Sequence, residues 1–219
     1  MPTQFTIQQT EKALREYRTK HLRGYDKRDQ NETATRMLYV DKFIEDVLGY
    51  DLKDDICVEQ QIRDRYADYV IKLGRKEYFV IEAKAIGIDL NPKHLEQSRR
   101  YALDEGIDWA ILTNGRQVEL YRIMSNTNSP VKIFSFDLTD LSSIRSAAKH
   151  IAYITKKSVI KNELEIFWKR FDALTPENLK KTIYSSEVVR AIRLKVRKNS
   201  GVNFTDSEVT KSLGDILPK

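Results

Sequence analysis

Asp68-Tyr69-Val70-Ile71 and Tyr78-Phe79-Val80-Ile81-Glu82-Ala83-Lys84 are two apolar, β-rich runs, and the way they pair decides the fold. Residues two apart on a strand point to the same face, so Glu82 and Lys84 project together while Ile81 and Ala83 point the other way. The segment Leu73-Gly74-Arg75-Lys76 turns between the runs and can bring Asp68 back beside Glu82. We therefore expect two carboxylates and a lysine to share one small site, suited to holding a divalent cation against a phosphate.

Hydrophobic periodicity predicts a mixed α/β core in the first part of the chain. Asn31 is a predicted N-cap, with Glu32 in the first turn where the helix dipole favours an acid, and Gly49 ends that helix. Asn114-Gly115 predicts a hairpin between two short strands. Helices are expected at 4–21, 31–48 and 91–105, and strands at 56–62, 66–73, 77–85, 109–113 and 117–123, with an edge strand at 132–136.

After Thr139 the pattern is helical again, at 140–155, 161–172, 176–184, 186–198 and 205–217. We expect one domain of residues 1–155 and a basic helical region of residues 156–219. Residues 156–198 include twelve basic side chains against five acidic ones, whereas the whole chain carries a net charge of +6. Such a segment fits a polyanionic partner, and the alternative is a solvated helical surface. The expected nucleic-acid contacts in it are Arg190, Arg193, Lys195, Arg197 and Lys198.

The composition is that of an ordinary globular chain, with 219 residues, 41% of them hydrophobic and 32% charged. No apolar run approaches the roughly 18 residues that cross a bilayer, and the N-terminus has no signal-peptide pattern. The single cysteine, Cys57, excludes an internal disulfide and a cysteine-based zinc site, and the three histidines are scattered. We expect a cytoplasmic protein without membrane contact.

The acids around Lys84 match the ligands that magnesium prefers, which are one or two carboxylates completed by water and substrate phosphate. Asp68 and Glu82 are the candidate carboxylates, and the backbone carbonyl of Ala83 is a third ligand. Lys84 would contact water or phosphate. Burial and a metal lower the pKa of Lys84 while the two acids raise it, and the sequence does not say which effect is larger. The alternative is an ion pair of Glu82 and Lys84 on an exposed strand face.

The helix expected at 91–105 carries a second candidate feature. Gln97 and Tyr101 are four residues apart and therefore share one helix face. These two residues, with Arg100 beside them, could reach a phosphate or a base, or orient a residue of the site. Alternatively, Tyr101 is a core aromatic residue with its hydroxyl at the rim, and Gln97 is an exposed helix former.

Taken together, these motifs resemble the PD-(D/E)xK nucleases, in the form found in the N-terminal nuclease domain of type I restriction enzyme R subunits. The resemblance covers residues 31–123, and the order of its motifs is more specific than any one of them. It rests on Asn31-Glu32-Thr33-Ala34-Thr35 with Val47-Leu48-Gly49-Tyr50-Asp51, Arg65-Tyr66-Ala67-Asp68-Tyr69-Val70, Glu82-x-Lys84, Gln97-x-x-x-Tyr101, and Leu112-Thr113-Asn114-Gly115-Arg116 with Glu119-Leu120-Tyr121.

This resemblance implies a restriction-endonuclease-like fold, in which helices flank a mixed central sheet. It implies that Asp68 and Glu82 bind Mg2+, with Mn2+ as a substitute, and that Lys84 is catalytic. Glu32 would be an accessory acid near the metal, and Gln97 and Tyr101 would assist in engaging DNA. Larger members of the family carry a helicase motor, but this chain has no phosphate loop and no methyltransferase or specificity region.

We therefore expect a Mg2+-dependent endonuclease that hydrolyses DNA in restriction or phage defence. It would act as a homodimer, or with a partner subunit of a restriction system. Two alternatives stay open. One is a catalytically silent module of the same fold that holds nucleic acid or a partner protein, and the other is a nuclease that acts on RNA.

Overall fold

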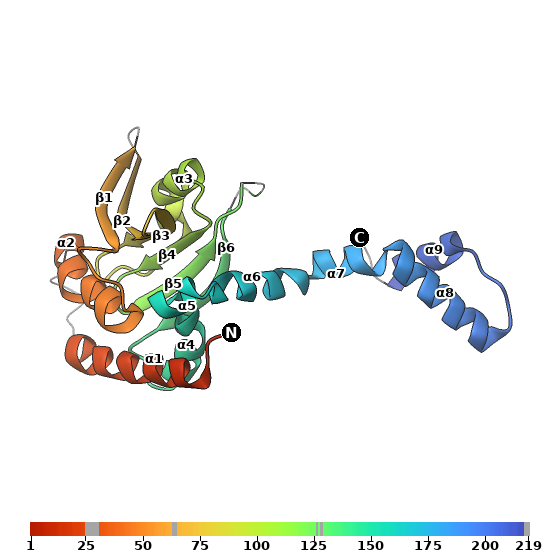
Figure 1. Cartoon of the computed structure of the whole chain (residues 1–219), viewed down its shortest axis with the longest axis horizontal. Coiled ribbons are helices and arrows are strands. Elements are labelled where there is room, and N and C mark those ends of the chain that lie inside the picture. Colours follow the sequence, from red (N-terminus) through yellow and green to blue (C-terminus); the bar gives the residue numbers. More distant parts are fainter. Residues whose placement is uncertain (25–30, 63–64, 126, 128, 217–219) are drawn as a thin grey trace. The chain divides into compact units, whose positions relative to one another are not determined.

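The computed structural model describes residues 1–24, 31–62, 65–125, 127 and 129–216, except for the side chains of residues 58–66 (Figure 1). The chain divides into two compact units, Met1–Leu164 and Glu165–Lys219, and each is described by itself. The first unit holds a sheet with helices on both faces, and the second is helical. This is the mixed α/β architecture with C-terminal helices that the sequence predicts.

The first unit is organised around one six-stranded sheet with the strand order β1-β2-β3-β4-β5-β6. Neighbouring strands are antiparallel except for β3 and β4, which are parallel and are connected through α3. Each strand expected from the sequence is present, and β6 lies at an edge as predicted. The strands are β1 (Ile56–Ile62), β2 (Arg65–Leu73), β3 (Lys76–Ala83), β4 (Trp109–Thr113), β5 (Gln117–Arg122) and β6 (Val131–Asp137).

Helices cover the two faces of this sheet, and α3 packs on β2, β3 and β4. A buried cluster fills the space under α3, with Val70, Val80 and Leu112 from the sheet and Tyr101 from the helix. On the opposite face, His150 of α4 contacts the rings of two β6 phenylalanines, and α1 packs against α4. The helical elements of this unit are α1 (Gln4–Tyr17), η1 (Arg18–Leu22), α2 (Glu32–Thr35), η2 (Arg36–Val40), η3 (Phe43–Leu48), η4 (Pro92–Leu95), α3 (Glu96–Glu105), α4 (Ile144–Ile151), η5 (Ala152–Ile154) and α5 (Lys156–Ile160).

The helix expected at 31–48 is present but changes its winding along its length. It starts as α2, capped by Asn31 as predicted, continues as two π-helical segments, η2 and η3, and ends at Gly49 in the left-handed conformation. A π-helical turn holds more residues than an α-helical one, so 3.6-residue spacing no longer predicts which side chains face inward. In the sequence, Met37 stands at helical spacing with Val40 and Ile44 and is therefore expected on the apolar face, but it is 64% exposed.

The second unit consists of helices whose positions agree with those expected from the sequence. Its elements are most of α6 (Glu163–Ala173), α7 (Pro176–Ile183), α8 (Ser186–Ser200) and α9 (Asp206–Ile216). Pro176 occupies the first turn of α7, and the side chain of Thr175 caps it. Gly201 ends α8 in the left-handed conformation. Among the described residues, the structure contains no helix with the length and apolar character needed to cross a bilayer.

Gly115 marks the point where the β4–β5 hairpin meets the N-terminal helices. Its φ is +83°, and a Cβ atom at this position would lie 2.4 Å from the Cβ of Tyr39. The hydroxyl of Tyr17 also donates a hydrogen bond to the carbonyl of Gly115 over 2.7 Å. The predicted Asn114-Gly115 turn therefore needs glycine for its conformation and for close packing as well.

Replacing Gly115 by alanine should lower the free energy of unfolding by about 3 kcal/mol or more, because left-handed strain and overpacking add. Gly74 provides the matched control, since its φ is +64° but a Cβ there meets nothing within 4 Å. Gly74→Ala should cost only about 1–2 kcal/mol. Urea unfolding followed by circular dichroism measures both variants. Equal losses in the two variants would contradict the role of the Tyr39 contact.

Candidate active site

The pairing of β2 with β3 places Asp68 next to Glu82. Tyr69 lies opposite Ile81 in this antiparallel register, so the preceding Asp68 lies opposite Glu82. The carboxylate of Asp68 turns toward β3, where its Oδ2 accepts a hydrogen bond of 2.7 Å from the backbone N–H of Ala83. The two acids predicted from the sequence are therefore neighbours, and the backbone of one strand fixes the carboxylate of the other.

Lys84 lies between two acids that come from different parts of the chain. Its Nζ donates hydrogen bonds to Oε1 of Glu82 over 2.6 Å and to Oε2 of Glu32 over 3.3 Å. Glu32 is in the first turn of α2, whose N-terminus is capped by the Asn31 side chain through a 2.8 Å bond to the N–H of Ala34. The cap thus sets the start of the helix that brings Glu32 to Lys84.

Ser98 is a member of this cluster that the sequence did not reveal. Its Oγ donates a 2.7 Å hydrogen bond to Oε2 of Glu82, and the residue is completely buried. Since Lys84 binds the other oxygen, both carboxylate oxygens of Glu82 have a donor. Ser98 immediately follows Gln97 in the segment singled out in the sequence, but helical spacing alone did not show that a serine there faces a strand carboxylate.

Arg36 is the second such residue, and it faces the other acid. Its Nη1 lies 3.6 Å from Oδ1 of Asp68, and its guanidinium lies over the ring of Tyr69, 4.9 Å from the centroid. The Tyr69 hydroxyl in turn donates a 2.7 Å hydrogen bond to Asp41. Arg36 follows Glu32 by four residues, so both can lie on one face of the opening helix, but this spacing alone did not show that the face meets Asp68 and Lys84.

The chain after Lys84 is held in place by backbone contacts from two directions. The N–H of Lys84 donates to the carbonyl of Thr113 at the end of β4 over 2.9 Å. The N–H of Ile86 donates to the Thr35 hydroxyl over 3.0 Å, and the buried Arg116 side chain donates to the Ile86 carbonyl over 3.1 Å. The opening helix and the β4–β5 hairpin together therefore position Lys84.

Burial and charge shift the pKa values of all three central groups. Burial raises the pKa of Asp68 and of Glu82, and the neighbouring charge of Asp68 raises that of Glu82 further. Burial lowers the pKa of Lys84, but its hydrogen bond to Glu82 and the charges of Glu82, Glu32 and Asp68 outweigh this, and the net shift is upward. The sequence did not show which effect on the pKa of Lys84 is larger. Without a metal, the combined effect of the neighbouring acids is larger than that of burial.

Among the described residues, the other predicted site residues form no hydrogen bond or ion pair with this cluster. Gln97 and Arg100 are exposed on α3, while Tyr101 is 2% exposed within the core under that helix. Burial raises the pKa of Tyr101 to about 12. This placement agrees with the alternative in which Tyr101 is a core residue, and contact of these side chains with DNA stays a prediction. The predicted basic contacts, Arg190, Arg193, Lys195, Arg197 and Lys198, belong to the second unit.

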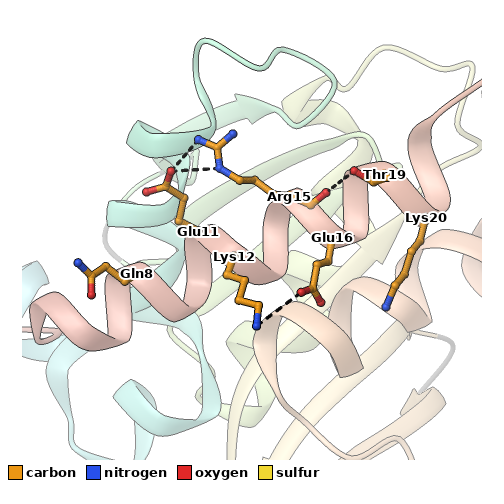
Figure 2. Close-up of a pocket in the computed structure, with 7 residues that line it drawn as sticks. All are labelled: Gln8, Glu11, Lys12, Arg15, Glu16, Thr19 and Lys20. Carbon is orange, nitrogen blue, oxygen red and sulfur yellow. Dashed lines mark hydrogen bonds and ion pairs between the residues drawn. The ribbon is translucent and has the colours of Figure 1, made fainter.

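A hollow of about 480 Å3 lies along α1, and none of the residues that line it belongs to the candidate active site. Figure 2 shows that charged side chains line it, with Arg15 paired to Glu11 and Lys12 to Glu16 along the helix. The pairs follow the i, i+4 spacing of an exposed helix face. Because two of its three cationic side chains are paired with acids of the same helix, this hollow presents a largely compensated surface.

The described residues contain no group of three or more histidine, cysteine or acidic side chains placed to hold a metal ion. The donors at the cluster are the carboxylates of Asp68 and Glu82 and the carbonyl of Ala83. In a strand the N–H and C=O of one residue point to the same side, so this carbonyl faces the side on which Asp68 binds the Ala83 N–H. Two carboxylates and a carbonyl suit Mg2+, which keeps several waters.

Comparison with known families adds one result. Residues 31–136 match the family described as the type I restriction enzyme R protein N terminus. This match confirms the resemblance predicted from the motifs, and it covers Glu32, Asp68, Glu82 and Lys84. The searches of curated proteins and of solved structures found no match to the chain. The family match supports a role in a restriction system.

The Ser98→Ala variant should raise the pKa of Glu82 above its already raised value, because the lost hydrogen bond favours the ionised carboxylate. It should also lower the free energy of unfolding by about 1.5–3 kcal/mol, as for other hydrogen bonds to charged groups. Carbon-13 NMR titration of the Glu82 carboxyl measures the pKa. Ser98→Thr, which keeps the hydroxyl, serves as the control. An unchanged titration in Ser98→Ala would show that this bond does not act on Glu82.

Proposed function

We propose that the protein is a Mg2+-dependent endonuclease of a restriction system and that it hydrolyses DNA phosphodiester bonds at Asp68, Glu82 and Lys84. One observation carries this proposal. Two largely buried carboxylates meet beside a lysine at the end of the β2–β3 pair, inside the segment that matches the restriction enzyme family. An ordinary surface ion pair does not explain this arrangement, because Glu82 is buried and a second acid lies against it.

The cluster offers Mg2+ the carboxylates of Asp68 and Glu82 and the carbonyl of Ala83. Bound there, the ion would supply a water of lowered pKa and stabilise negative charge on the phosphate. The raised pKa values of the two acids support the assignment, since buried carboxylates that lack full compensation gain most from a cation.

The chain's own cations would act on the substrate and on water. The raised pKa of Lys84 keeps its side chain protonated. Its hydrogen bonds to Glu82 and Glu32 hold the ammonium group between these two acids. From there it would donate to a phosphate oxygen or orient a water, and Glu32 would keep it in that position. Arg36 would hold Asp68 in the orientation that its bond to Ala83 sets.

A binding module without turnover is the second candidate, and one observation favours it. Lys84 forms ion pairs with Glu82 and with Glu32, and Arg36 lies beside Asp68, so each of the three acids has a cationic neighbour without any metal. In that function the fold would present a surface to nucleic acid or to a partner protein. The two candidates differ in one measurable respect, because only the nuclease gains activity when Mg2+ or Mn2+ is added.

Plasmid cleavage with Mg2+ and with Mn2+ tests the proposed activity. Wild-type protein should nick or cut the plasmid, and EDTA should abolish the reaction. Lys84→Ala and Glu82→Ala should each reduce the rate by at least about 100-fold, because a lost charge-stabilising group costs a factor of this order. Glu11→Gln on α1 serves as the control and should retain the wild-type rate.

Two outcomes would contradict the nuclease. Cleavage that persists in both variants would place the activity at another site or in a contaminant. Failure of wild type to cleave with either metal, while it still binds DNA, would favour the binding module. Faster cleavage of RNA than of DNA under the same conditions would assign the site to RNA.

A further inference from the structure

Helix α8 of the second unit carries an uncompensated row of positive charges. Arg190, Lys195, Arg197 and Lys198 are exposed, and from Val188 to Ser200 the helix contains no acidic residue. In the part of the chain that the structure describes, none of these four side chains forms an ion pair. Two of them, Arg197 and Lys198, also suit the negative end of the helix dipole. The dipole does not explain Arg190 and Lys195, which lie before the last turn.

The packing of α8 leaves the charged side free. Val189, Ile192 and Val196 follow one another at i, i+3 and i+7, and Val189 is buried. Ile192 and Val196 line an apolar groove of about 220 Å3 with Val209 of α9. Arg190, Arg197 and Lys198, at i, i+7 and i+8, therefore belong to the other side of the helix, away from α9, and Lys195, three residues before Lys198, lies next to them.

One of the five residues predicted to contact nucleic acid, Arg193, already forms an ion pair within the second unit. Nε of Arg193 lies 2.6 Å from Oδ1 of Asp206 in the first turn of α9. This pair ties the two helices together and compensates the charge of Arg193. The face of α8 that remains open to a polyanion consists of Arg190, Lys195, Arg197 and Lys198, which we call the α8 basic face.

In the described part of the chain, the charges of the α8 basic face are unpaired, whereas the exposed charges of α1 are paired, and this difference distinguishes a binding surface from a solvated one. On α1, Arg15 pairs with Glu11 and Lys12 pairs with Glu16, so the exposed charges cancel along the helix (Figure 2). A helix that only needs solubility can use such i, i+4 pairs. The α8 basic face lacks them, and four like charges on one helix repel each other unless an anion compensates them.

We propose that the α8 basic face binds the phosphate backbone of duplex DNA and supplies affinity outside the candidate active site. The choice of DNA as the polyanion rests on the proposed function, while the charge of the helix stands independently of it. Lysine and arginine side chains on one side of a helix neutralise phosphates and release condensed counterions. Such contacts carry no sequence information, so they increase affinity equally for all DNA sequences.

The test compares two full-length variants with the same change in charge. Arg190→Gln/Lys195→Gln/Lys198→Gln removes three charges from the α8 basic face and retains Arg197 and the Arg193–Asp206 pair. Lys12→Gln/Arg15→Gln/Lys20→Gln removes three charges from α1 and η1. Binding of a short fluorescein-labelled DNA duplex is followed by anisotropy in EDTA, so that no cleavage occurs. Circular dichroism checks that each variant keeps its helix content.

In salt titrations from about 50 to about 200 mM, the α8 variant should lose about 0.9 from the slope of log K against log salt for each lost phosphate contact. Its affinity near 100 mM salt should fall about 10-fold or more, and the α1 variant should stay within about twofold of wild type. As a second variant, Arg190→Lys/Arg197→Lys keeps the charges and should retain most of the affinity, because counterion release depends on the number of phosphate charges neutralised.

Three results would overturn the proposal: an α8 variant that binds the duplex as wild type does, an equal loss in the α1 variant, or a loss confined to RNA duplexes assayed in parallel. Because binding is measured without metal, failure of the nuclease would appear only in the cleavage assay. Failure of the α8 basic face would appear only in the binding assay.

Discussion

The carboxylates of Asp68 and Glu82 are held side by side, largely out of water, and the rest of the first unit is arranged around this constraint. The antiparallel register of β2 and β3 puts the two residues opposite each other, and the Ala83 N–H fixes the Asp68 carboxylate. Two buried like charges are costly unless cations or donors compensate them. Lys84, Arg36 and Ser98 provide that compensation from three different elements.

This requirement explains why helices far apart in the sequence converge on one end of the β2–β3 pair. The opening helix contributes Glu32 and Arg36 to the cluster, and α3 contributes Ser98. The β4–β5 hairpin holds the chain after Lys84 through Thr113 and Arg116. A parallel β3–β4 pair needs a crossover, and α3 supplies both the crossover and a donor to Glu82.

The strands, the turn and the central acids could be predicted from the sequence because each depends on local pattern. Period-two alternation places Glu82 and Lys84 together, and the residue types of Asn114-Gly115 are enough to mark its hairpin. The roles of Ser98 and Arg36 were not predicted from the sequence. They depend on which face of a helix meets the sheet, and the spacing within one helix does not reveal this. Tyr101 shows the same limit, since its spacing from Gln97 predicts a shared face while its burial follows from packing under α3. The exposure of Met37 was not predicted because π-helical winding changes the periodicity on which the prediction relied.

Calorimetric titration with Mn2+ tests most directly whether the two carboxylates form a metal site. Asp68→Asn keeps the shape of the side chain and an oxygen that can accept the Ala83 N–H, but it removes the negative charge. Wild type should bind Mn2+, and Asp68→Asn should bind it at least about 10-fold more weakly, a difference of about 1.4 kcal/mol. Equal affinity in the two proteins, or no binding by wild type, would contradict the assignment of Asp68 and Glu82 as metal ligands.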